Sequence, residues 1–162
     1  MAKGLIQVYY GNGRGKTTAA LGQGIRAASQ GKNVFIIQFL KEKNLNEISF
    51  IARLEPEIKL FRFEKADEGY DGLTEEEKEK AIASIRNGMN FAKKVLVTEE
   101  CQVLILDEAL GLLEQGIISI EDMRNILKAK HEETEIILTG QNMCPEIADM
   151  MDRIYRIDLV KD

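Results

Sequence analysis

The stretch LIQVYYGNGRGKTT, residues 5–18, joins a short apolar run to a glycine-rich segment that ends in one lysine and two threonines. Residues 5–10 are typical of a buried strand, and residues 17–29 favour a helix closed by Gly31. Residues 34–39 form a second run rich in β-forming residues, and a helix between two such strands predicts a right-handed parallel crossover. The chain is therefore expected to begin with a strand, a phosphate loop, a helix and a parallel strand.

Three alternating glycines in this segment indicate a loop that binds an anion. Successive backbone N–H groups can point inward around a phosphate, and the helix N-terminus adds its partial positive charge. Glycine is needed because a Cβ would obstruct the tight turn and the approach of backbone to phosphate oxygens. Lys16 is expected to bring its charge to the outer phosphates, and the Thr17 hydroxyl to ligate Mg²⁺. The residues predicted to bind a triphosphate are Gly11, Asn12, Gly13, Arg14, Gly15, Lys16, Thr17 and Thr18.

The loop is a variant of the common pattern G-x-x-x-x-G-K-[ST]. That pattern would place its first glycine at Tyr10, whereas this chain has glycine at position 11. The loop should still cradle phosphate, because the lysine and the hydroxyl follow the last glycine as usual.

A second element of the predicted site follows an apolar strand. Residues 103–106 are apolar at every position, which predicts a central parallel strand covered on both faces. Asp107 and Glu108 then lie at its carboxyl end, the edge of a parallel sheet where ligands bind. Asp107 is expected to hold Mg²⁺ directly or through water, and Glu108 to contact the metal shell or a ribose hydroxyl. An ordinary helix cap is the alternative for both acids.

Two other polar features are ambiguous. Residues 139–142, TGQN, end another predicted strand, and form either a third wall of the cleft or a simple polar turn. Arg26 lies on the helix that follows the loop, and it either contacts the nucleotide or is solvated.

The remainder of the chain continues the alternation of strands and helices. Thr74 with Glu77 forms a capping box for a helix to about Glu99, and Ser119 with Asp122 begins another helix. Further strands are expected at residues 58–63, 135–138 and 154–159, and a surface loop at residues 64–73. The expected fold class is α/β: a three-layer P-loop NTPase domain of the RecA-like kind, with a mainly parallel sheet and a single domain over residues 1–162.

Composition excludes several classes of protein. The net charge of −5 and the pI near 5.1 argue against general binding to nucleic acid, which requires a basic face. The sequence has neither a signal-peptide pattern nor an apolar run of about 18 residues, so we expect a cytoplasmic protein without membrane contact. Cys101 and Cys144 are too few for a disulfide framework and are expected to be reduced and packed.

Beyond the general motif, several segments in order resemble one family. They are residues 11–20 (GNGRGKTTAA), residues 26–28 (RAA), Gly31, residues 34–41 ending in QFLK, residues 106–108 (LDE), residues 138–140 (LTG), and Pro145 through Ala148 and Asp149. In this form and order they resemble the P-loop type of ATP:cob(I)alamin (corrinoid) adenosyltransferase. The resemblance spans nearly the whole chain and is strongest over residues 5–41.

The resemblance implies a reaction at carbon. In that family the Co(I) of a reduced corrinoid attacks the 5′ carbon of ATP, the whole triphosphate leaves, and the loop grips the γ-phosphate end of a nucleotide held in reversed polarity. ATP and the corrinoid are then the substrates and Mg²⁺ the metal ion, with a flavoprotein reductase as partner and a homodimer as the assembly. No general base is required, because cobalt is the nucleophile.

Site residues follow from the resemblance position by position. Residues 11–18 would bind the triphosphate, with Lys16, Thr17 and Asp107 as the catalytic set, and Thr17 and Asp107 as the metal ligands. Glu108 and Arg26 would help to place the ribose or the base. Residues 38–41, beginning with Gln38, would line the cleft near the corrinoid. The chain departs from the family at Gln141, where arginine is common.

Two other classes of function stay open at this point. One is a P-loop ATPase or a nucleotide-dependent regulatory module that lacks the corrinoid site, and the other is a small-molecule kinase. Analysis of the products distinguishes them: the transferase yields triphosphate and an adenosylated corrinoid, whereas hydrolysis yields ADP and orthophosphate.

Overall fold

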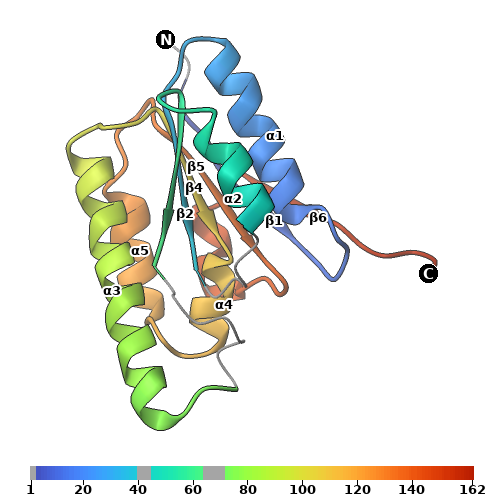
Figure 1. Ribbon diagram of the computed structural model, residues 1–162, viewed down its shortest axis with the longest axis vertical. Helices are drawn as coiled ribbons and strands as arrows, with labels where there is room; N and C mark the ends of the chain where they lie inside the picture. The colour runs from blue at the N-terminus through green and yellow to red at the C-terminus, as the bar shows by residue number, and fades with distance from the viewer. Residues whose placement is uncertain (1–2, 40–44, 64–71) are drawn as a thin grey trace.

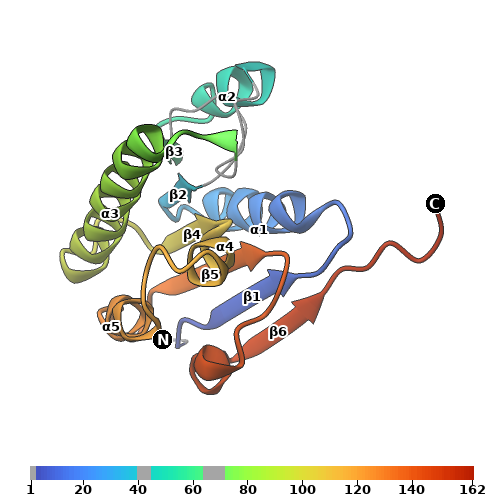
Figure 2. The same ribbon diagram turned by 90° about the horizontal axis from the view of Figure 1, so that it is seen from below.

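The computed structural model describes residues 3–39, 45–63 and 72–162. Its strands form one six-stranded sheet in the order β3-β2-β4-β5-β1-β6, and every neighbouring pair is parallel (Figures 1 and 2). The strands are β1 (Ile6–Tyr10), β2 (Val34–Gln38), β3 (Ile58–Arg62), β4 (Val103–Asp107), β5 (Glu135–Gly140) and β6 (Arg153–Arg156). The helices are α1 (Lys16–Ser29), α2 (Leu45–Ala52), α3 (Glu75–Val97), α4 (Ala109–Glu114), α5 (Ile120–Lys128) and the 3₁₀ helix η2 (Pro145–Met150).

Apolar side chains cover both faces of the central strands. All five residues of β2 and of β4 are buried, which is the pattern expected of parallel strands with helices on both sides. Along β4, Val103 and Ile105 join one buried cluster, while Leu104 and Leu106 join another. Successive side chains of a strand point to opposite faces, so the two clusters are the two cores of the domain.

Each core is completed by its own set of helices. On one face α1 and α2 contribute residues such as Ala20, Ala27 and Ile51 to the smaller cluster. On the other face α3, α4 and α5 contribute Ile85, Leu110 and other residues to the larger cluster. Figure 2 shows α1 and α2 on one side of the sheet and α3 and α5 on the other. This arrangement confirms the predicted three-layer α/β fold with a parallel sheet.

Helix caps appear where the sequence predicted them. The Thr74 side chain accepts a hydrogen bond from the Glu77 backbone N–H at 3.2 Å, and the Glu77 carboxylate accepts one from the Thr74 N–H at 3.2 Å, so α3 begins in a capping box. At α5 the Ser119 hydroxyl accepts from the Asp122 N–H at 3.0 Å. The expected loop at residues 64–73 lies mostly outside the described residues.

Three short helices, α2, α4 and η2, were not anticipated from the sequence. The residues before α4 and η2, Glu108 and Cys144, make no side-chain cap hydrogen bond. Short helices of this kind are held by packing on the sheet and carry little local signal. The last strand also differs: β6 ends at Arg156, whereas strand was expected to reach Leu159.

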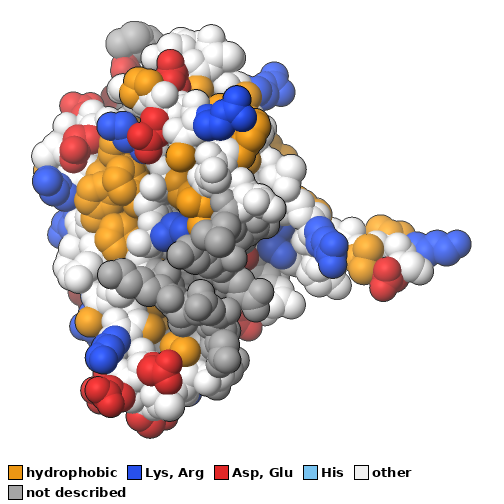
Figure 3. Space-filling view, in the orientation of Figure 1, with side chains coloured by type: hydrophobic (Ala, Val, Ile, Leu, Met, Phe, Trp, Pro, Cys, Tyr) orange, Lys and Arg blue, Asp and Glu red, His pale blue; other side chains and the backbone are white. Residues whose placement is uncertain are grey.

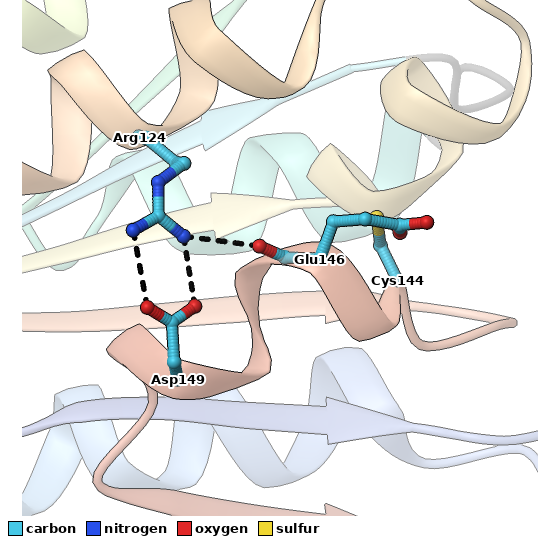
Figure 4. Close-up of polar contacts among 4 residues, drawn as sticks. All are labelled: Arg124, Cys144, Glu146 and Asp149. Carbon is cyan, nitrogen blue, oxygen red and sulfur yellow. Dashed lines mark hydrogen bonds and ion pairs between the residues drawn. The ribbon is translucent and has the colours of Figure 1, made fainter.

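A bidentate ion pair connects α5 with η2 (Figure 4). The Arg124 guanidinium donates to both carboxylate oxygens of Asp149, at 2.8 and 3.0 Å, and to the Glu146 carbonyl at 3.0 Å. Arg124 also lowers the pKa of Asp149 through this hydrogen bonding. Because η2 leads directly into β6, the pair helps to set where the last strand begins.

Both cysteines are free thiols, as expected. Cys101 is buried, and burial raises the pKa of its thiol to about 12, which leaves it unreactive at neutral pH. Cys144 is half-buried and donates to the Glu146 carboxylate at 2.9 Å (Figure 4).

The surface mixes charges of both signs. Figure 3, in the orientation of Figure 1, shows basic and acidic side chains interspersed over the visible face, and the C-terminal tail projecting from the body of the domain. Among the described helices, none combines the length and the apolar character needed to cross a membrane.

Candidate nucleotide-binding site

The glycine-rich loop connects β1 to α1, as predicted, and lies at the carboxyl end of the sheet. Gly11 and Gly15 have φ angles of +131° and +104°, which side-chain-bearing residues rarely adopt. Helix α1 then begins at Lys16, and the Gly15 carbonyl accepts its first hydrogen bond, from the Ala19 N–H at 2.7 Å. The loop therefore delivers the chain directly to a helix N-terminus, where the backbone dipoles favour an anion.

A cleft of about 370 Å³ opens over this helix N-terminus. Most of its lining comes from the loop and the first turns of α1, with one acid from α2 and one from the end of β4. The lining residues are Gly13, Arg14, Gly15, Lys16, Thr17, Thr18, Leu21, Glu47 and Glu108.

The Lys16 ammonium folds back over the loop. It donates to the Gly11 carbonyl at 2.8 Å and to the Gly13 carbonyl at 3.3 Å. These carbonyls hold the positive charge at the rim of the cleft, where an outer phosphate would meet it.

Asp107 organises the floor of the site. Its side chain is 0% exposed, yet it accepts hydrogen bonds from the Thr17 hydroxyl at 2.8 Å, the Thr139 hydroxyl at 2.6 Å and the Gln38 amide at 3.3 Å. A buried carboxylate requires donors of this kind, because burial without partners is strongly unfavourable. Three different strands or helices, α1, β5 and β2, supply the donors.

Thr139 links the two acids at the end of β4. Its hydroxyl donates to Asp107 and accepts a hydrogen bond from the Glu108 backbone N–H at 2.8 Å. Glu108 has a left-handed backbone, with φ of 63°, and starts α4. Strand β5 lies between β1 and β4 in the sheet, so the end of β5 reaches both the loop and the acids.

The residues present fit Mg²⁺, the metal ion that the family resemblance implies. The Thr17 hydroxyl lies 2.8 Å from a buried carboxylate at the mouth of a phosphate loop, and hydroxyl and carboxylate oxygens are ligands that Mg²⁺ accepts. Among the described residues no cluster of three or more His, Cys, Asp or Glu side chains could hold a metal ion. Thr17 and Asp107 would hold Mg²⁺ together with phosphate oxygens and water, as such sites commonly do.

The structure places most of the predicted site residues together and Arg26 elsewhere. Arg26 is exposed in the last turn of α1, ten residues beyond Lys16 and so about 15 Å along the helix axis. Gln38 is buried, donates to Asp107 and lines the small cavity beside Thr17 and Asp107, but it does not line the cleft over the loop. Leu40 and Lys41, which were expected near the corrinoid, lie outside the described residues.

Residues 139–142 (TGQN) were predicted to form either a third wall of the cleft or a polar turn, and the structure shows some of each. Thr139 belongs to the site, because its hydroxyl contacts Asp107. The Asn142 amide instead donates to Glu114 of α4 at 2.8 Å, and Gln141 contributes its backbone carbonyl to the Gly11 N–H at 3.1 Å. The first of these four residues is therefore part of the site, and the last two serve the turn.

Glu47 is the cleft residue that sequence reasoning missed. It lies in the first turn of α2 and lines the cleft together with a small cavity beside Thr17 and Asp107. The signal for it in the sequence is an acid near the start of a short helix, and α2 itself was not anticipated.

Comparison with known proteins agrees with this geometry. The family model described as ATP:corrinoid adenosyltransferase BtuR/CobO/CobP matches residues 2–162. The chain is 29% identical to the corrinoid adenosyltransferase of Escherichia coli (strain K12), over 98% of this chain and 79% of that protein. It is 30% identical to the corrinoid adenosyltransferase CobA of Salmonella typhimurium (strain LT2), with the same two coverages.

A solved structure supports the fold. The KaiC-like protein PH0186 from Pyrococcus horikoshii OT3 superposes with a TM-score of 0.60 at 17% identity, covering 100% of this chain and 76% of that one. At this identity the likeness supports the α/β fold alone. The match of the family model over residues 2–162 goes further. The chain belongs to the ATP:corrinoid adenosyltransferase family.

Proposed function

We propose that this protein transfers the 5′-deoxyadenosyl group of ATP to the Co(I) of a reduced corrinoid and releases triphosphate. The observation that carries the proposal is the phosphate loop with its Lys16 ammonium and its Thr17–Asp107 pair, in a chain whose whole length matches the family. In this reaction a Co–C bond forms, the C5′–O bond of ATP breaks, and the cobalt supplies the electron pair.

The loop stabilises the leaving group. Negative charge accumulates on the triphosphate as the C5′–O bond breaks, and donors already aimed at that charge lower the barrier most effectively. The N–H groups around the start of α1 and the Lys16 ammonium are such donors. Because they are held by the backbone and by the Gly11 and Gly13 carbonyls, little reorganisation is needed.

The proposed reaction requires no general base from the cleft. The two acids of the described lining are Glu47 and Glu108. A cobalt nucleophile carries no proton to be removed, so none of these groups is required to act as a base. Glu108 is suited to a ribose hydroxyl, since it lies half-exposed at the cleft wall.

Mg²⁺ held by Thr17 and Asp107 would neutralise part of the triphosphate charge. Asp107 orients the Thr17 hydroxyl by accepting a hydrogen bond from it at 2.8 Å, which leaves the oxygen lone pairs of Thr17 directed elsewhere. We assign Asp107 the role of orienting this hydroxyl, with direct or water-mediated contact to the ion.

For the reductant and the oligomeric state, the proposal rests on the family resemblance alone. A flavoprotein reductase would supply the electrons that make Co(I), and a homodimer would be the active form. Analytical ultracentrifugation with and without nucleotide measures the oligomeric state directly.

The decisive test of the activity is product analysis. The protein is incubated anaerobically with Mg·ATP and a chemically reduced corrinoid, and both nucleotide and cobalt products are followed. We expect equal amounts of triphosphate and adenosylated corrinoid. ADP and orthophosphate without a Co–C bond would instead identify an ATPase and overturn the proposal.

Replacing Thr139 with valine is expected to lower kcat/KM about tenfold or more, because the hydroxyl holds both Asp107 and the Glu108 N–H and its loss leaves buried polar groups unpaired. Valine keeps the shape of threonine. Thr139→Ser restores the hydroxyl and is the matched control. Steady-state kinetics over a range of Mg²⁺ concentrations check the prediction, which fails if the valine variant matches the serine variant.

A further inference from the structure

The first half of the phosphate loop contacts the C-terminal end of the described chain. The Gly13 N–H donates to the Ile157 carbonyl at 2.9 Å, and the Ile157 N–H donates to the Tyr10 carbonyl at 2.7 Å. The Asn12 side chain accepts a hydrogen bond from the Leu159 N–H at 3.2 Å. We call residues 157–159 the C-terminal strap.

Crowding by the strap explains two of the loop glycines. A Cβ on Gly11 would lie 2.2 Å from the Ile157 carbonyl oxygen, and one on Gly13 would lie 2.9 Å from the same atom. A Cβ on Gly15 would meet nothing within 4 Å, and that residue needs glycine for its φ of +104°. Gly11 and Gly13 thus both leave room for the strap, with Gly11 also requiring glycine for its φ of +131°, whereas Gly15 requires glycine for its backbone conformation alone.

The strap is anchored on the α1 side of the sheet. Ile157 is half-buried and packs against the smaller core cluster. It directly follows β6, which pairs with β1, and in β6 the Tyr155 ring stacks on Tyr9 with centroids 5.0 Å apart. These contacts fix the strap beside the loop, while Val160 beyond it is 93% exposed.

The residues that the strap contacts are the ones that hold the catalytic lysine. Lys16 donates to the carbonyls of Gly11 and Gly13, the two glycines against which the strap packs. The strap thereby orders the backbone that positions the Lys16 ammonium. The same contact engages the Gly13 N–H, which is then not free to bind phosphate.

We infer that the C-terminal strap is a positioning element of the phosphate loop. It fixes the backbone of residues 10–13 and the Lys16 ammonium, so that a polyphosphate is gripped by the second half of the loop, residues 14–18. The inference rests on the proposed function only in that the loop binds a polyphosphate.

Truncation measures the contribution of the strap. A chain that ends after Arg156 keeps β6 and loses the strap, whereas a control chain that ends after Val160 keeps both. We expect the first to bind Mg·ATP and inorganic triphosphate about tenfold more weakly in calorimetry, since several hydrogen bonds that order the loop are gone, and the second to bind like the full chain. Thermal unfolding of both chains confirms that the measured protein is folded.

A double-mutant cycle shows whether the loop residues act through the strap. Gly13→Ala and Asn12→Ala should each weaken binding several-fold in the full chain, where they displace or release the strap, and by less than about twofold in the chain that ends after Arg156. Gly13 has no left-handed φ, so alanine there is not strained by the backbone itself.

Two outcomes would overturn the inference. One is equal losses from Gly13→Ala and Asn12→Ala in the two backgrounds, and the other is unchanged or tighter binding after truncation, as expected of a strap that competes with phosphate. Because inorganic triphosphate carries no adenosyl group, these results are independent of whether a corrinoid is adenosylated.

Discussion

Lys16→Ala is expected to reduce kcat/KM on the order of 100- to 1,000-fold, the range seen when one preorganised donor to a developing charge is removed. The ammonium lies at the rim of the cleft, held by the Gly11 and Gly13 carbonyls at 2.8 and 3.3 Å. Alanine removes the cation that those carbonyls hold at the loop. We therefore expect weaker triphosphate binding as well as slower transfer, measured by calorimetry and by single-turnover kinetics.

Lys94→Ala is the matched control for this change. Lys94 is an exposed residue in the last turn of α3 and is absent from the lining of the cleft, so its replacement alters net charge equally without touching the site. Lys16→Arg adds a second comparison, because a planar guanidinium does not reproduce the compact charge of an ammonium. A Lys16→Ala protein as active as the Lys94→Ala protein would contradict the assigned role.

Asp107→Asn is expected to lower Mg²⁺-dependent turnover about 100-fold while binding of metal-free nucleotide changes little. The substitution keeps the shape of the side chain but removes its charge. It also replaces one carboxylate oxygen, an acceptor, by an NH₂ group, a donor. Three donors surround this position: the Thr17 and Thr139 hydroxyls and the Gln38 amide. The Thr17 hydroxyl would lose its fixed orientation, and the proposed metal ion would lose its carboxylate ligand.

Titration with Mg²⁺ separates this effect from general damage. The apparent metal affinity of Asp107→Asn should fall, and raising the Mg²⁺ concentration should recover part of the activity. Asp162→Asn, at the exposed end of the chain, is the control with the same change of charge. If the metal dependence of Asp107→Asn is that of the unmodified protein, Asp107 does not serve the ion.

Much of the fold could be predicted because its signals are local. An apolar run of four residues is enough to mark a buried strand such as β4, and the Thr74 to Glu77 spacing marks the start of α3. The loop from Gly11 to Thr18 was recognisable for the same reason: phosphate binding by backbone N–H groups needs a fixed order of glycines, a cation and a hydroxyl along the chain.

Residues that act through distant contacts were harder to assign. Thr139 touches Asp107 across 32 positions of sequence, and nothing in TGQN distinguishes a hydroxyl that faces an acid from one in a turn. Glu47 enters the cleft on α2, a helix of eight residues that was not anticipated from the sequence. Arg26 was left open between nucleotide contact and solvation, with the family resemblance implying contact with the ribose or the base, and α1 carries it to the helix end opposite Lys16.

The parallel α/β fold, the phosphate loop and the pair of acids at the end of β4 were predictable from the sequence, because each depends on residues that are neighbours in the chain. Which polar groups meet is apparent only in the folded chain, where Thr139 and Gln38 support Asp107, and Gly11 and Gly13 make room for the strap. The physical reason is that hydrogen bonds and close packing depend on distances of a few ångströms, and the folding of the sheet sets those distances between segments far apart in sequence.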